Sequence, residues 1–373
     1  MKIGIEAQRI FRPDKHGMDF VILEVLRQLQ HRDDGHEYVV FVAPGKDHCL
    51  TNSERMQIVE LHCPTYPLWE QWALPRAVRK WGVEILHCTS NTAPLRCPVP
   101  LILTLHDIIF LQNKKPHGMS TYQQMGWYYR RWNVPRILDR CRHIITVSNT
   151  EQANILTRFP QIKERLQVVH NGYSEVYRPI DDTYSITGRY LSARHYLLYL
   201  GNTDPRKNLD GVLRAYNEYL NRSERDLKLI ITGLPQEYVE NRLVKLGLEI
   251  CAPNLVYTGY VPGEDLPALY NGAFAFLFPS LLEGFGLPVL EAMACGTPVI
   301  TSNCSSLPEV AGAGGILVNP HNPNEIADAL IRLEADADWY RQQVGYGLER
   351  SGQFSWKHTA EGYTRLYDRF RQT

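Results

Sequence analysis

Short apolar runs alternate with helical patterns along the first half of the chain. The runs are rich in β-branched and aliphatic residues and cover residues 2–7, 38–43, 57–62, 83–89, 100–107, 143–148 and 166–170. Such bounded runs predict buried strands, and their alternation with helices favours a doubly wound parallel sheet. The clearest helix lies between the first two runs, because apolar residues recur from Met18 to Leu29 at the spacing i, i+3, i+4, i+7.

The same alternation begins again in the second half. Apolar runs recur at residues 196–201, 227–233, 255–261, 274–278 and 299–300. The two series are separated by Asn171-Gly172 and the segment SEVYRPIDDTYSITG, whose composition is typical of an exposed linker. We therefore predict an N-terminal Rossmann-like domain over residues 1–175 and a C-terminal one over residues 176–355, followed by an amphipathic helix over residues 356–373.

Composition and charge exclude several classes of protein. Forty Lys and Arg residues balance forty Asp and Glu residues, so the overall charge does not favour a nucleic-acid partner. No run of apolar residues is long enough to predict a transmembrane helix, and the N-terminus reads as a first strand and not as a signal peptide. The eight cysteines follow no disulfide-domain spacing, which favours a reducing cytoplasm.

The most informative stretch covers residues 276–300, FLFPSLLEGFGLPVLEAMACGTPVI. It predicts a buried strand, a Gly-rich turn, a helix and the next strand. Gly286 permits a tight turn, and Pro288 suits the first turn of a helix. The free N–H groups at the helix start favour a phosphate, and Glu283 and Glu291 can accept hydrogen bonds from sugar hydroxyls. Phosphate and hydroxyls together indicate a nucleotide sugar.

Glu283 and Glu291 in the setting EGFGLPVLEAMACGTPVI resemble the E-x(7)-E signature of retaining family 4 glycosyltransferases, which have the GT-B fold. The following segment, ITSNCSSLPEVAGAGGILVNPHNPNEIADAL, continues the resemblance. Weaker similarity extends over the whole chain. The resemblance implies two Rossmann-like domains facing across a cleft, with the donor mainly on the second domain and the acceptor on the first. It also implies that the last helix crosses back onto the first domain.

In the N-terminal domain, two positions fit the resemblance. His106-Asp107 ends the fifth predicted strand, where such sheets bind ligands, and in similar enzymes a histidine at this position contacts the transferred sugar. For His87, which also ends a strand, we favour a structural role. The family has a Gly-Gly pair before the first helix where this chain has His16-Gly17. Gly17 is therefore predicted to let the backbone approach the ligand, unless it only relieves the turn.

In the C-terminal domain, Arg206 and Lys207 follow a predicted strand and precede a helix. Two cations at a helix start add charge to a backbone anion site, and the resemblance implies that they bind the donor diphosphate and stabilise the leaving group. The predicted catalytic set is then His106, Arg206, Lys207 and Glu283. The predicted donor-binding residues are Gly17, Gly233, Tyr260, Phe285, Gly286, Leu287 and Glu291. The chain has no D-x-D triad suited to a metal, and the resemblance implies no cofactor beyond the nucleotide sugar.

Residues 114–143 combine seven cations and one acid with many aromatic residues, among them Trp127, Tyr128 and Trp132. A basic aromatic helix can lie at an anionic membrane or hold a phosphorylated lipid. We favour the alternative, in which the aromatic side packs on the sheet and the arginines stay in water. Peripheral membrane contact is retained as a hypothesis.

The expected function is transfer of a hexose, with retention of configuration, from a nucleotide sugar to a saccharide or lipid-linked saccharide. General resemblance to bacterial mannosyltransferases of surface polysaccharide assembly suggests GDP-mannose as the donor. The expected location is the cytoplasm or the inner face of the cell membrane. The alternatives are a UDP-sugar-dependent glycosyltransferase, a nucleotide-sugar epimerase of the same architecture, and a catalytically silent nucleotide-sugar-binding subunit. A nucleic-acid-binding protein built on the basic segment is disfavoured by the balanced charge.

Overall fold

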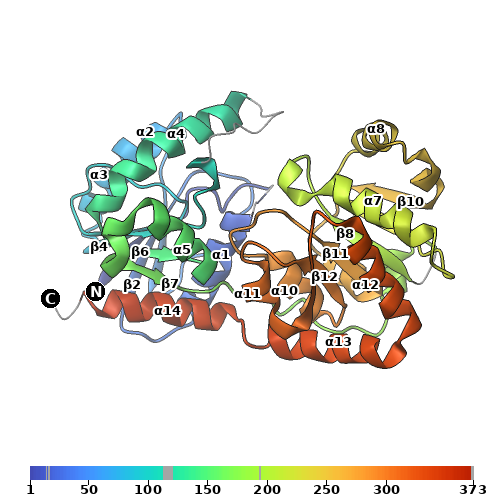
Figure 1. The fold of residues 1–373 in the computed structure, drawn as a ribbon. Helices are drawn as coiled ribbons and strands as arrows, with labels where there is room; N and C mark the ends of the chain where they lie inside the picture. Colours follow the sequence, from blue (N-terminus) through green and yellow to red (C-terminus); the bar gives the residue numbers. More distant parts are fainter. Residues whose placement is uncertain (14, 16, 112–120, 193–194, 371–373) are drawn as a thin grey trace. The chain divides into compact units, whose positions relative to one another are not determined.

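A computed structural model describes residues 1–370 except residues 14, 16, 112–120 and 193–194. The chain forms two compact units (Figure 1). Unit 1 contains Met1–Gly172 and Ser355–Thr373, and unit 2 contains Tyr173–Phe354. The last segment of the chain therefore belongs to the unit that the first segment forms.

Unit 1 is built on a parallel sheet of order β3-β2-β1-β4-β5-β6-β7. The strands are β1 (Lys2–Glu6), β2 (Glu37–Val42), β3 (Met56–Glu60), β4 (Ile85–Cys88), β5 (Leu101–Thr104), β6 (Cys141–Thr146) and β7 (Leu166–Val168). Each predicted apolar run overlaps one of these strands, because a strand covered on both faces has apolar side chains on both. The fifth strand is shorter than predicted, since β5 ends at Thr104 and His106 lies in the loop that follows.

Helices cover both faces of this sheet. One face packs against α1 (Gly17–Gln30) and α14 (Trp356–Asp368). The other packs against α3 (Leu74–Lys80), α4 (Thr121–Ile137) and α5 (Asn149–Arg158), which supply Val78, Val134 and Ile155 to one core with Leu86, Leu103 and Ile144 of the strands. The shorter helical segments are α2 (Tyr66–Leu68), η1 (Trp69–Ala73), η2 (Ile109–Leu111), η3 (Leu138–Arg140) and η4 (Pro160–Arg165).

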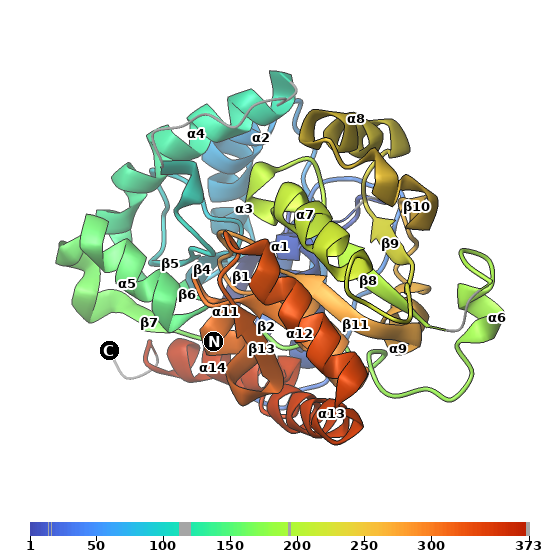
Figure 2. The ribbon, with the colours of Figure 1, turned by 45° about the vertical axis from the view of Figure 1, so that its right-hand side comes forward.

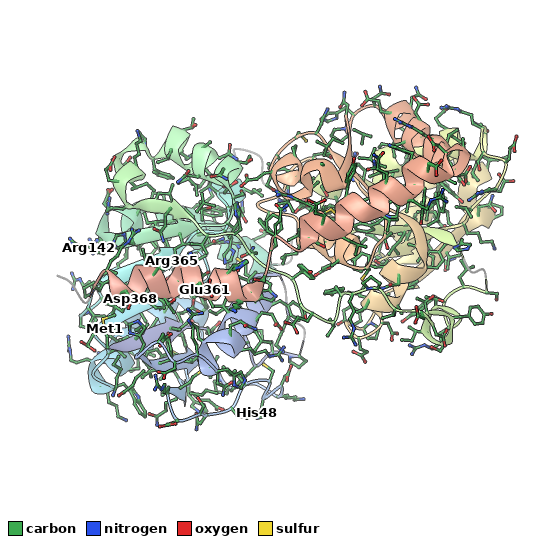
Figure 3. The ribbon with its side chains drawn as sticks, turned by 90° about the horizontal axis from the view of Figure 1, so that it is seen from below. Met1, His48, Arg142, Glu361, Arg365 and Asp368 are labelled. Carbon is green, nitrogen blue, oxygen red and sulfur yellow. The ribbon has the colours of Figure 1, made fainter. Side chains whose placement is uncertain are left out.

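Helix α14 is held on the sheet by buried polar contacts. Figure 3 shows it in the foreground of unit 1, with Glu361, Arg365 and Asp368 along its length. On its inner side, Tyr367 Oη lies 2.7 Å from His87 Nδ1, and His87 Nε2 lies 2.8 Å from Thr104 Oγ1. Burial lowers the pKa of His87 to about 3, so this imidazole is neutral at physiological pH. His87 is a core residue, in agreement with the structural role favoured from the sequence.

The two places where the chain leaves and re-enters unit 1 lie against each other. Gly172 packs so closely on Ser355-Trp356 that an added Cβ atom would lie 2.1 Å from the backbone nitrogen of Trp356. Only glycine fits such an approach, because real Cβ contacts are more than 1 Å longer.

Unit 2 has a parallel sheet of order β10-β9-β8-β11-β12-β13. Its strands are β8 (Tyr196–Leu200), β9 (Leu229–Thr232), β10 (Leu255–Gly259), β11 (Ala273–Phe278), β12 (Val299–Ser302) and β13 (Gly315–Val318). Its helices are α6 (Tyr184–Thr187), α7 (Leu209–Leu220), α8 (Gln236–Leu246), α9 (Leu266–Gly272), α10 (Leu287–Ala294), α11 (Leu307–Ala311), α12 (Pro323–Ala335) and α13 (Ala337–Ser351). The 3₁₀ turns are η5 (Pro205–Lys207), η6 (Glu249–Asn254) and η7 (Gly312–Gly314).

The core of unit 2 has the same two-sided plan. Figure 2 shows α7 and α12 side by side over the strands, and with α8 they bury Leu213, Val239 and Leu330 on one face. On the other face, Tyr270 of α9 packs its ring edge-on against Phe276 of β11. The strand–turn–helix–strand prediction for residues 276–300 is confirmed by β11, α10 and β12.

All eight cysteines are free thiols. No helix in the described part of the chain is long and apolar enough to cross a membrane. Likewise, the described residues include no group of three His, Cys, Asp or Glu side chains placed to hold a metal ion.

Candidate active site

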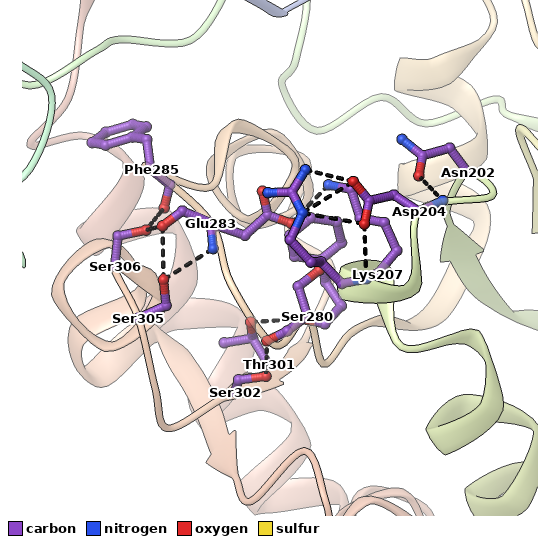
Figure 4. A network of polar contacts seen from close by, with 12 residues as sticks. Asn202, Asp204, Lys207, Ser280, Glu283, Phe285, Thr301, Ser302, Ser305 and Ser306 are labelled. Carbon is purple, nitrogen blue, oxygen red and sulfur yellow. Dashed lines mark hydrogen bonds and ion pairs between the residues drawn. The ribbon is translucent and has the colours of Figure 1, made fainter. Parts of the chain in front are cut away.

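The loop between β8 and α7 holds Arg206 and Lys207 in a 3₁₀ turn. Asp204 starts the turn, because its carboxylate accepts a hydrogen bond from the Arg206 N–H at 3.0 Å. The same carboxylate accepts from Arg206 Nη2 at 2.6 Å, which orients the guanidinium (Figure 4). Burial alone would raise the pKa of Asp204, but the hydrogen bonds and charge of Arg206 lower it below its usual value. The turn is thus a preformed cationic element.

A second loop, between β11 and α10, is attached directly to the first. Asn208 adopts a left-handed conformation with φ of 60°, and its Nδ2 donates to the carbonyl of Pro279 at 3.0 Å. The Leu281 N–H donates to the carbonyl of Arg206 at 2.7 Å. These bonds place the cations beside Glu283, and Lys207 Nζ lies 2.7 Å from Glu283 Oε1.

Two serines fix the backbone around Glu283. Ser305 Oγ accepts from the Glu283 N–H at 2.9 Å and donates to its carbonyl at 2.7 Å. Ser306 Oγ lies at hydrogen-bond distance from the carbonyls of Glu283 and Phe285, at 2.9 and 2.7 Å (Figure 4). In the sequence, residues 301–309 are mostly small and polar, and their segment only continues the family resemblance. Their role in shaping the loop depends on a contact that spacing does not reveal.

Glu291 lies on α10, which starts where Gly286 turns the chain. Gly286 has φ of 123°, and a Cβ atom there would lie 2.9 Å from Leu307 Cδ2, so the turn requires glycine. Tyr270 Oη donates to Glu291 Oε2 at 3.1 Å. Burial raises the pKa of Glu291 to about 7, although hydrogen bonds from Tyr270 and Tyr177 oppose the rise. Near neutral pH this carboxyl group therefore exists in both protonation states.

The remaining residues predicted to bind the donor are less closely grouped. Gly233 follows β9 with φ of 77°, and its N–H donates to the carbonyl of Gly259 at 2.7 Å. Tyr260 follows β10 and is 78% exposed. The Phe285 ring is buried against Phe354, so the ring is not exposed to a ligand. Leu287 begins α10 directly after Gly286.

Gly17 begins α1 in unit 1, and among the described residues no atom lies within 4 Å of a Cβ atom placed there. The structure thus gives no packing reason for glycine at this position. His16, the other residue of the pair, lies outside the described residues.

In unit 1, His106 is held at two points by the loop after β4. Its backbone N–H donates to Asn91 Oδ1 at 2.6 Å, and its Nε2 lies 2.9 Å from the carbonyl of Thr89. A carbonyl only accepts, so Nε2 carries the proton. Burial lowers the pKa of His106, so the imidazole is neutral and presents the lone pair of Nδ1. The side chain is 7% exposed.

Buried carboxyl groups surround this loop, and the sequence analysis missed two of them. Glu6 and Glu70 are fully buried, and burial raises the pKa of both. Glu151 follows Ser148 at the spacing that is typical of a capping box, and Ser148 Oγ accepts from its N–H at 3.1 Å. Its carboxylate also accepts from the Ile108 N–H at 2.8 Å and so fixes the loop after His106. The available signal was an acid inside an apolar run, IGIEA for Glu6 and PLWEQWALP for Glu70.

Two doubly wound parallel-sheet units, the second carrying a cationic turn beside an E-x(7)-E loop and helix, define a glycosyltransferase of the GT-B fold. Family models agree for each half. The model described as "Glycosyl transferases group 1" matches residues 191–350, and the model "Glycosyltransferase Family 4" matches residues 16–175. The chain belongs to glycosyltransferase family 4, which confirms the family identified from the motif.

Similar proteins support the same placement. O-antigen chain mannosyltransferase B of Escherichia coli is 30% identical over 360 residues, which cover 95% of this chain and 88% of that protein. Serotype-specific mannosyltransferase WbdA of Escherichia coli is 29% identical over 301 residues, which cover 77% of this chain and 36% of that longer protein. Among solved structures, HepE of Anabaena in complex with UDP-glucose has a TM-score of 0.74 with 18% identity and covers 99% of both chains. That likeness confirms the fold.

Proposed function

We propose that this protein transfers mannose from GDP-mannose, with retention of configuration, to a hydroxyl group of a saccharide or lipid-linked saccharide in the assembly of a bacterial surface polysaccharide. The observation that carries the proposal is the junction of the Arg206-Lys207 turn with the Glu283 loop in unit 2. The choice of mannose and of a surface polysaccharide rests on the relatives, whose names describe O-antigen mannosyltransferases.

The proposed roles follow from the chemistry of each group. Arg206 and Lys207 bind the diphosphate and stabilise the negative charge that develops when the bond from the anomeric carbon to the diphosphate oxygen breaks. Glu283 accepts hydrogen bonds from donor-sugar hydroxyls, and Glu291 accepts from the ribose. His106 accepts a hydrogen bond at Nδ1 from a hydroxyl group of the transferred sugar.

Retention is proposed to proceed on one face of the sugar. No carboxylate is assigned as a nucleophile, and the acceptor oxygen forms the new bond to the anomeric carbon while its proton passes to the departing diphosphate. Positive charge from Arg206 and Lys207 takes the place that a metal ion has in other transferases, and no resident cofactor is proposed. NMR of the product anomer tests this step, because an inverted product contradicts it.

The donor is tested by thermal shift with GDP-mannose, GDP, UDP-glucose and UDP-GlcNAc. A ligand that binds only the folded chain raises the midpoint, so we expect a rise with GDP and GDP-mannose that is lost in Arg206→Ala and Glu283→Ala. Arg222→Ala is the matched control, because it breaks the Arg222–Asp328 ion pair, and Arg222 follows the C-terminal end of α7, away from the loop. A rise with uridine nucleotides alone would favour the UDP-sugar-dependent alternative.

Turnover separates the remaining alternatives. Conversion of the nucleotide sugar to its epimer without an acceptor would identify an epimerase. Donor binding without release of nucleotide in the presence of saccharide acceptors would identify a silent binding subunit.

We also propose that unit 1 lies peripherally on an anionic membrane at the inner face of the cell membrane. Helix α4 exposes Met125, Tyr128 and Trp132, and the Arg136 guanidinium lies 5.3 Å from the Trp132 ring. The neighbouring segment 66–80 exposes Leu68 and Trp72. The two segments are joined through Gln71 Nε2, which donates to Tyr129 Oη at 2.7 Å.

The sequence interpretation of this segment was correct only in part. Trp127 is buried in the core, as favoured, but Tyr128 and Trp132 face outward. Arg136, Arg140 and Arg142 are exposed, as expected, whereas Arg131 is half-buried and packs over the Trp127 ring at 4.5 Å. Lys114 and Lys115 lie outside the described residues. Liposome flotation with 30% anionic lipid (about the content of a bacterial membrane) tests the proposal, with Trp132→Ser and Arg136→Gln expected to reduce binding. Equal flotation of these variants would contradict it.

A further inference from the structure

The loop that holds His106 is itself fixed by Glu70. Thr89 and Asn91 bind His106, and the next residue, Thr92, donates its hydroxyl to Glu70 Oε1. The Asn91 N–H also donates to the carbonyl of Thr104 at 3.2 Å, and Asn91 has a left-handed φ of 68°. Four consecutive residues thus connect the imidazole to a buried carboxyl group.

The surroundings of Glu70 are unusual for a buried acid. Its Oε1 accepts from Tyr66 Oη at 2.7 Å, and its Oε2 accepts from the hydroxyl of Tyr129 and from Gln71 Nε2 at 2.9 Å. The side chain is fully buried, and all these donors are neutral groups. A buried carboxylate is normally paired with a cation, because desolvation of an unpaired charge is costly.

Glu70 joins three separate elements. It lies on the π-helical turn η1, and its partners come from α2, from the loop after β4 and from α4. If residue 70 only held these elements together, a neutral hydrogen-bonding side chain would be sufficient at this position. A titratable group at this position makes the link sensitive to protonation.

We propose that Glu70 is a positioning residue for His106, which acts through Thr92 and the loop 89–92 and changes the placement of the imidazole when it gains or loses a proton. The functional meaning of this inference rests on the proposed role of His106 in sugar transfer. The physical link between the two residues does not depend on that role.

Ionisation of Glu70 falls in the physiological range. Burial raises the pKa of Glu70 to about 7, against the hydrogen bonds from Thr92, Tyr129 and Tyr66, and the nearby charge of Glu6 raises it further. When Glu70 is ionised, all three hydroxyl groups can donate to it. When it is protonated, it must donate one bond of its own, so one of these hydroxyls must accept and redirect its own proton; Thr92 Oγ1 and Tyr66 Oη lie 2.8 Å apart, so either of them can pass its proton to the other.

The other titratable groups around Glu70 are accounted for. Tyr66 and Tyr129 face it from α2 and α4, and Cys88 faces it from β4; burial raises the pKa of all three, so they remain neutral at pH 7. Glu6 of β1 is another nearby acid, and Arg9 and Arg130 are cations near Tyr66.

Histidine ring NMR tests the link without any substrate. In selectively labelled protein, ¹⁵N signals of His106, assigned with His106→Gln, are followed from pH 5.5 to 8.5. We expect the Nε2–H tautomer throughout, with a shift whose midpoint lies near pH 7 in wild type. The shift should be lost in Glu70→Gln, which mimics the protonated acid at all pH values. The ring signals of His321, which belongs to unit 2, should be the same in wild type and Glu70→Gln and are the internal reference.

Two further variants keep the test decisive if Glu70→Gln folds poorly. Thr92→Val should remove the coupling while Glu70 keeps its tyrosine partners, and Thr92→Ser should restore it. Glu334→Gln is the matched control, because it disturbs a similar contact between a carboxylate and the hydroxyl of Tyr219 in unit 2. Persistence of the shift in Thr92→Val or in folded Glu70→Gln would overturn the proposal, and so would protonation of the imidazole itself.

Kinetics give the second readout. With GDP-mannose as donor and octyl α-mannoside as the acceptor probe, we expect kcat of Glu70→Gln to fall about 10- to 100-fold, since small misplacements of a positioned group have effects of this size. The KM for GDP-mannose should be unchanged. If wild type transfers no mannose but the NMR coupling is present, the proposed function is wrong and the physical link between Glu70 and His106 still holds. If the KM of Glu70→Gln for GDP-mannose rises with kcat unchanged, the positioning role of Glu70 is refuted.

Discussion

Lys207 Nζ lies 2.7 Å from Glu283 Oε1, although the two residues are 76 positions apart in the chain. Each comes from the loop that follows a central strand of unit 2, and each side chain is less than one-fifth exposed. Lys207 Nζ also lies 4.7 Å from the centre of the Phe278 ring, so its position is fixed from two sides. The cation proposed to bind the diphosphate and the acid proposed to bind the sugar therefore orient each other.

The first prediction is that Lys207 and Glu283 act as one unit in binding the donor. Lys207→Met and Glu283→Gln should each weaken GDP-mannose binding about tenfold or more, and the double variant should lose less than the sum, because each single variant already breaks the shared contact. Calorimetric titration of the four proteins gives the coupling free energy. An additive double variant would show that the residues act independently.

A second prediction concerns the pH dependence of stability at Glu291. Its pKa is about 7 in the folded chain and about 4.5 when exposed, so the folded state binds the proton more tightly and stability falls as pH rises between these values. Glu291→Gln should therefore increase the free energy of unfolding of unit 2 at pH 8, by at most about 3 kcal/mol, and much less at pH 5. Urea unfolding at both pH values measures this, with Glu240→Gln on the exposed side of α8 as a control that should show little change. A destabilised variant at pH 8 would contradict the prediction.

The third prediction is that His87 makes the stability of the folded chain fall as pH decreases, which is opposite to the effect of Glu291. His87 has a pKa of about 3 in the folded chain, well below its ordinary value of 6.5, so the unfolded chain binds more protons between these values. The contribution of His87 to the free energy of unfolding is therefore fully present above pH 6.5 and is lost as pH falls toward 3. His87→Leu should lower the melting temperature at pH 7.5, because Tyr367 and Thr104 lose a partner, but should flatten its decline toward pH 5. Tyr367→Phe, which keeps the imidazole, should retain the decline; an equal decline in His87→Leu would assign it to other groups.

The fourth prediction compares two glycines of unit 1. Gly172→Ala should destabilise the unit by about 1–3 kcal/mol, because the new methyl group meets the backbone of Trp356. Gly126→Ala in α4 is the matched control, since no atom of the described residues lies within 4 Å of its Cβ position and alanine favours a helix by about 0.5–1 kcal/mol. Thermal unfolding of both variants measures the difference. Equal stability of the two would show that the chain shifts to accept a side chain at residue 172.

The sequence was sufficient for the sheets and for the main motif. Parallel strands covered on both faces are apolar over their whole length, so runs such as residues 38–43 are visible without a structure. Glu283 and Glu291 could be identified because both belong to one continuous segment, with Glu283 in the turn and Glu291 in the helix that follows. The roles assigned to them and to Arg206, Lys207 and His106 stay predictions.

Contacts between segments that are far apart in the chain could not be predicted from the sequence. The partner of His87 lies 280 residues away on α14, and the partners of Glu70 come from three elements. The pattern of α4 was also ambiguous, because apolar and basic residues occur on all its sides, and only the packed core shows that Trp127 is buried while Trp132 is exposed. Tertiary contacts, which local patterns do not encode, decide each of these cases.

Because α14 lies at the end of the chain but packs on the first unit, it determines the order in which the two units are completed during synthesis. The 182 residues of unit 2, Tyr173–Phe354, are synthesised between the sheet of unit 1 and the helix that covers it. At about 5–20 residues per second, that interval lasts roughly 10 to 35 seconds. During it, the sheet face around His87 and Thr104 has no cover from Tyr363 and Tyr367. Unit 2, in contrast, is complete as soon as Phe354 has been added, before α14 is made. The second unit can therefore be completed before the first, although its synthesis begins later.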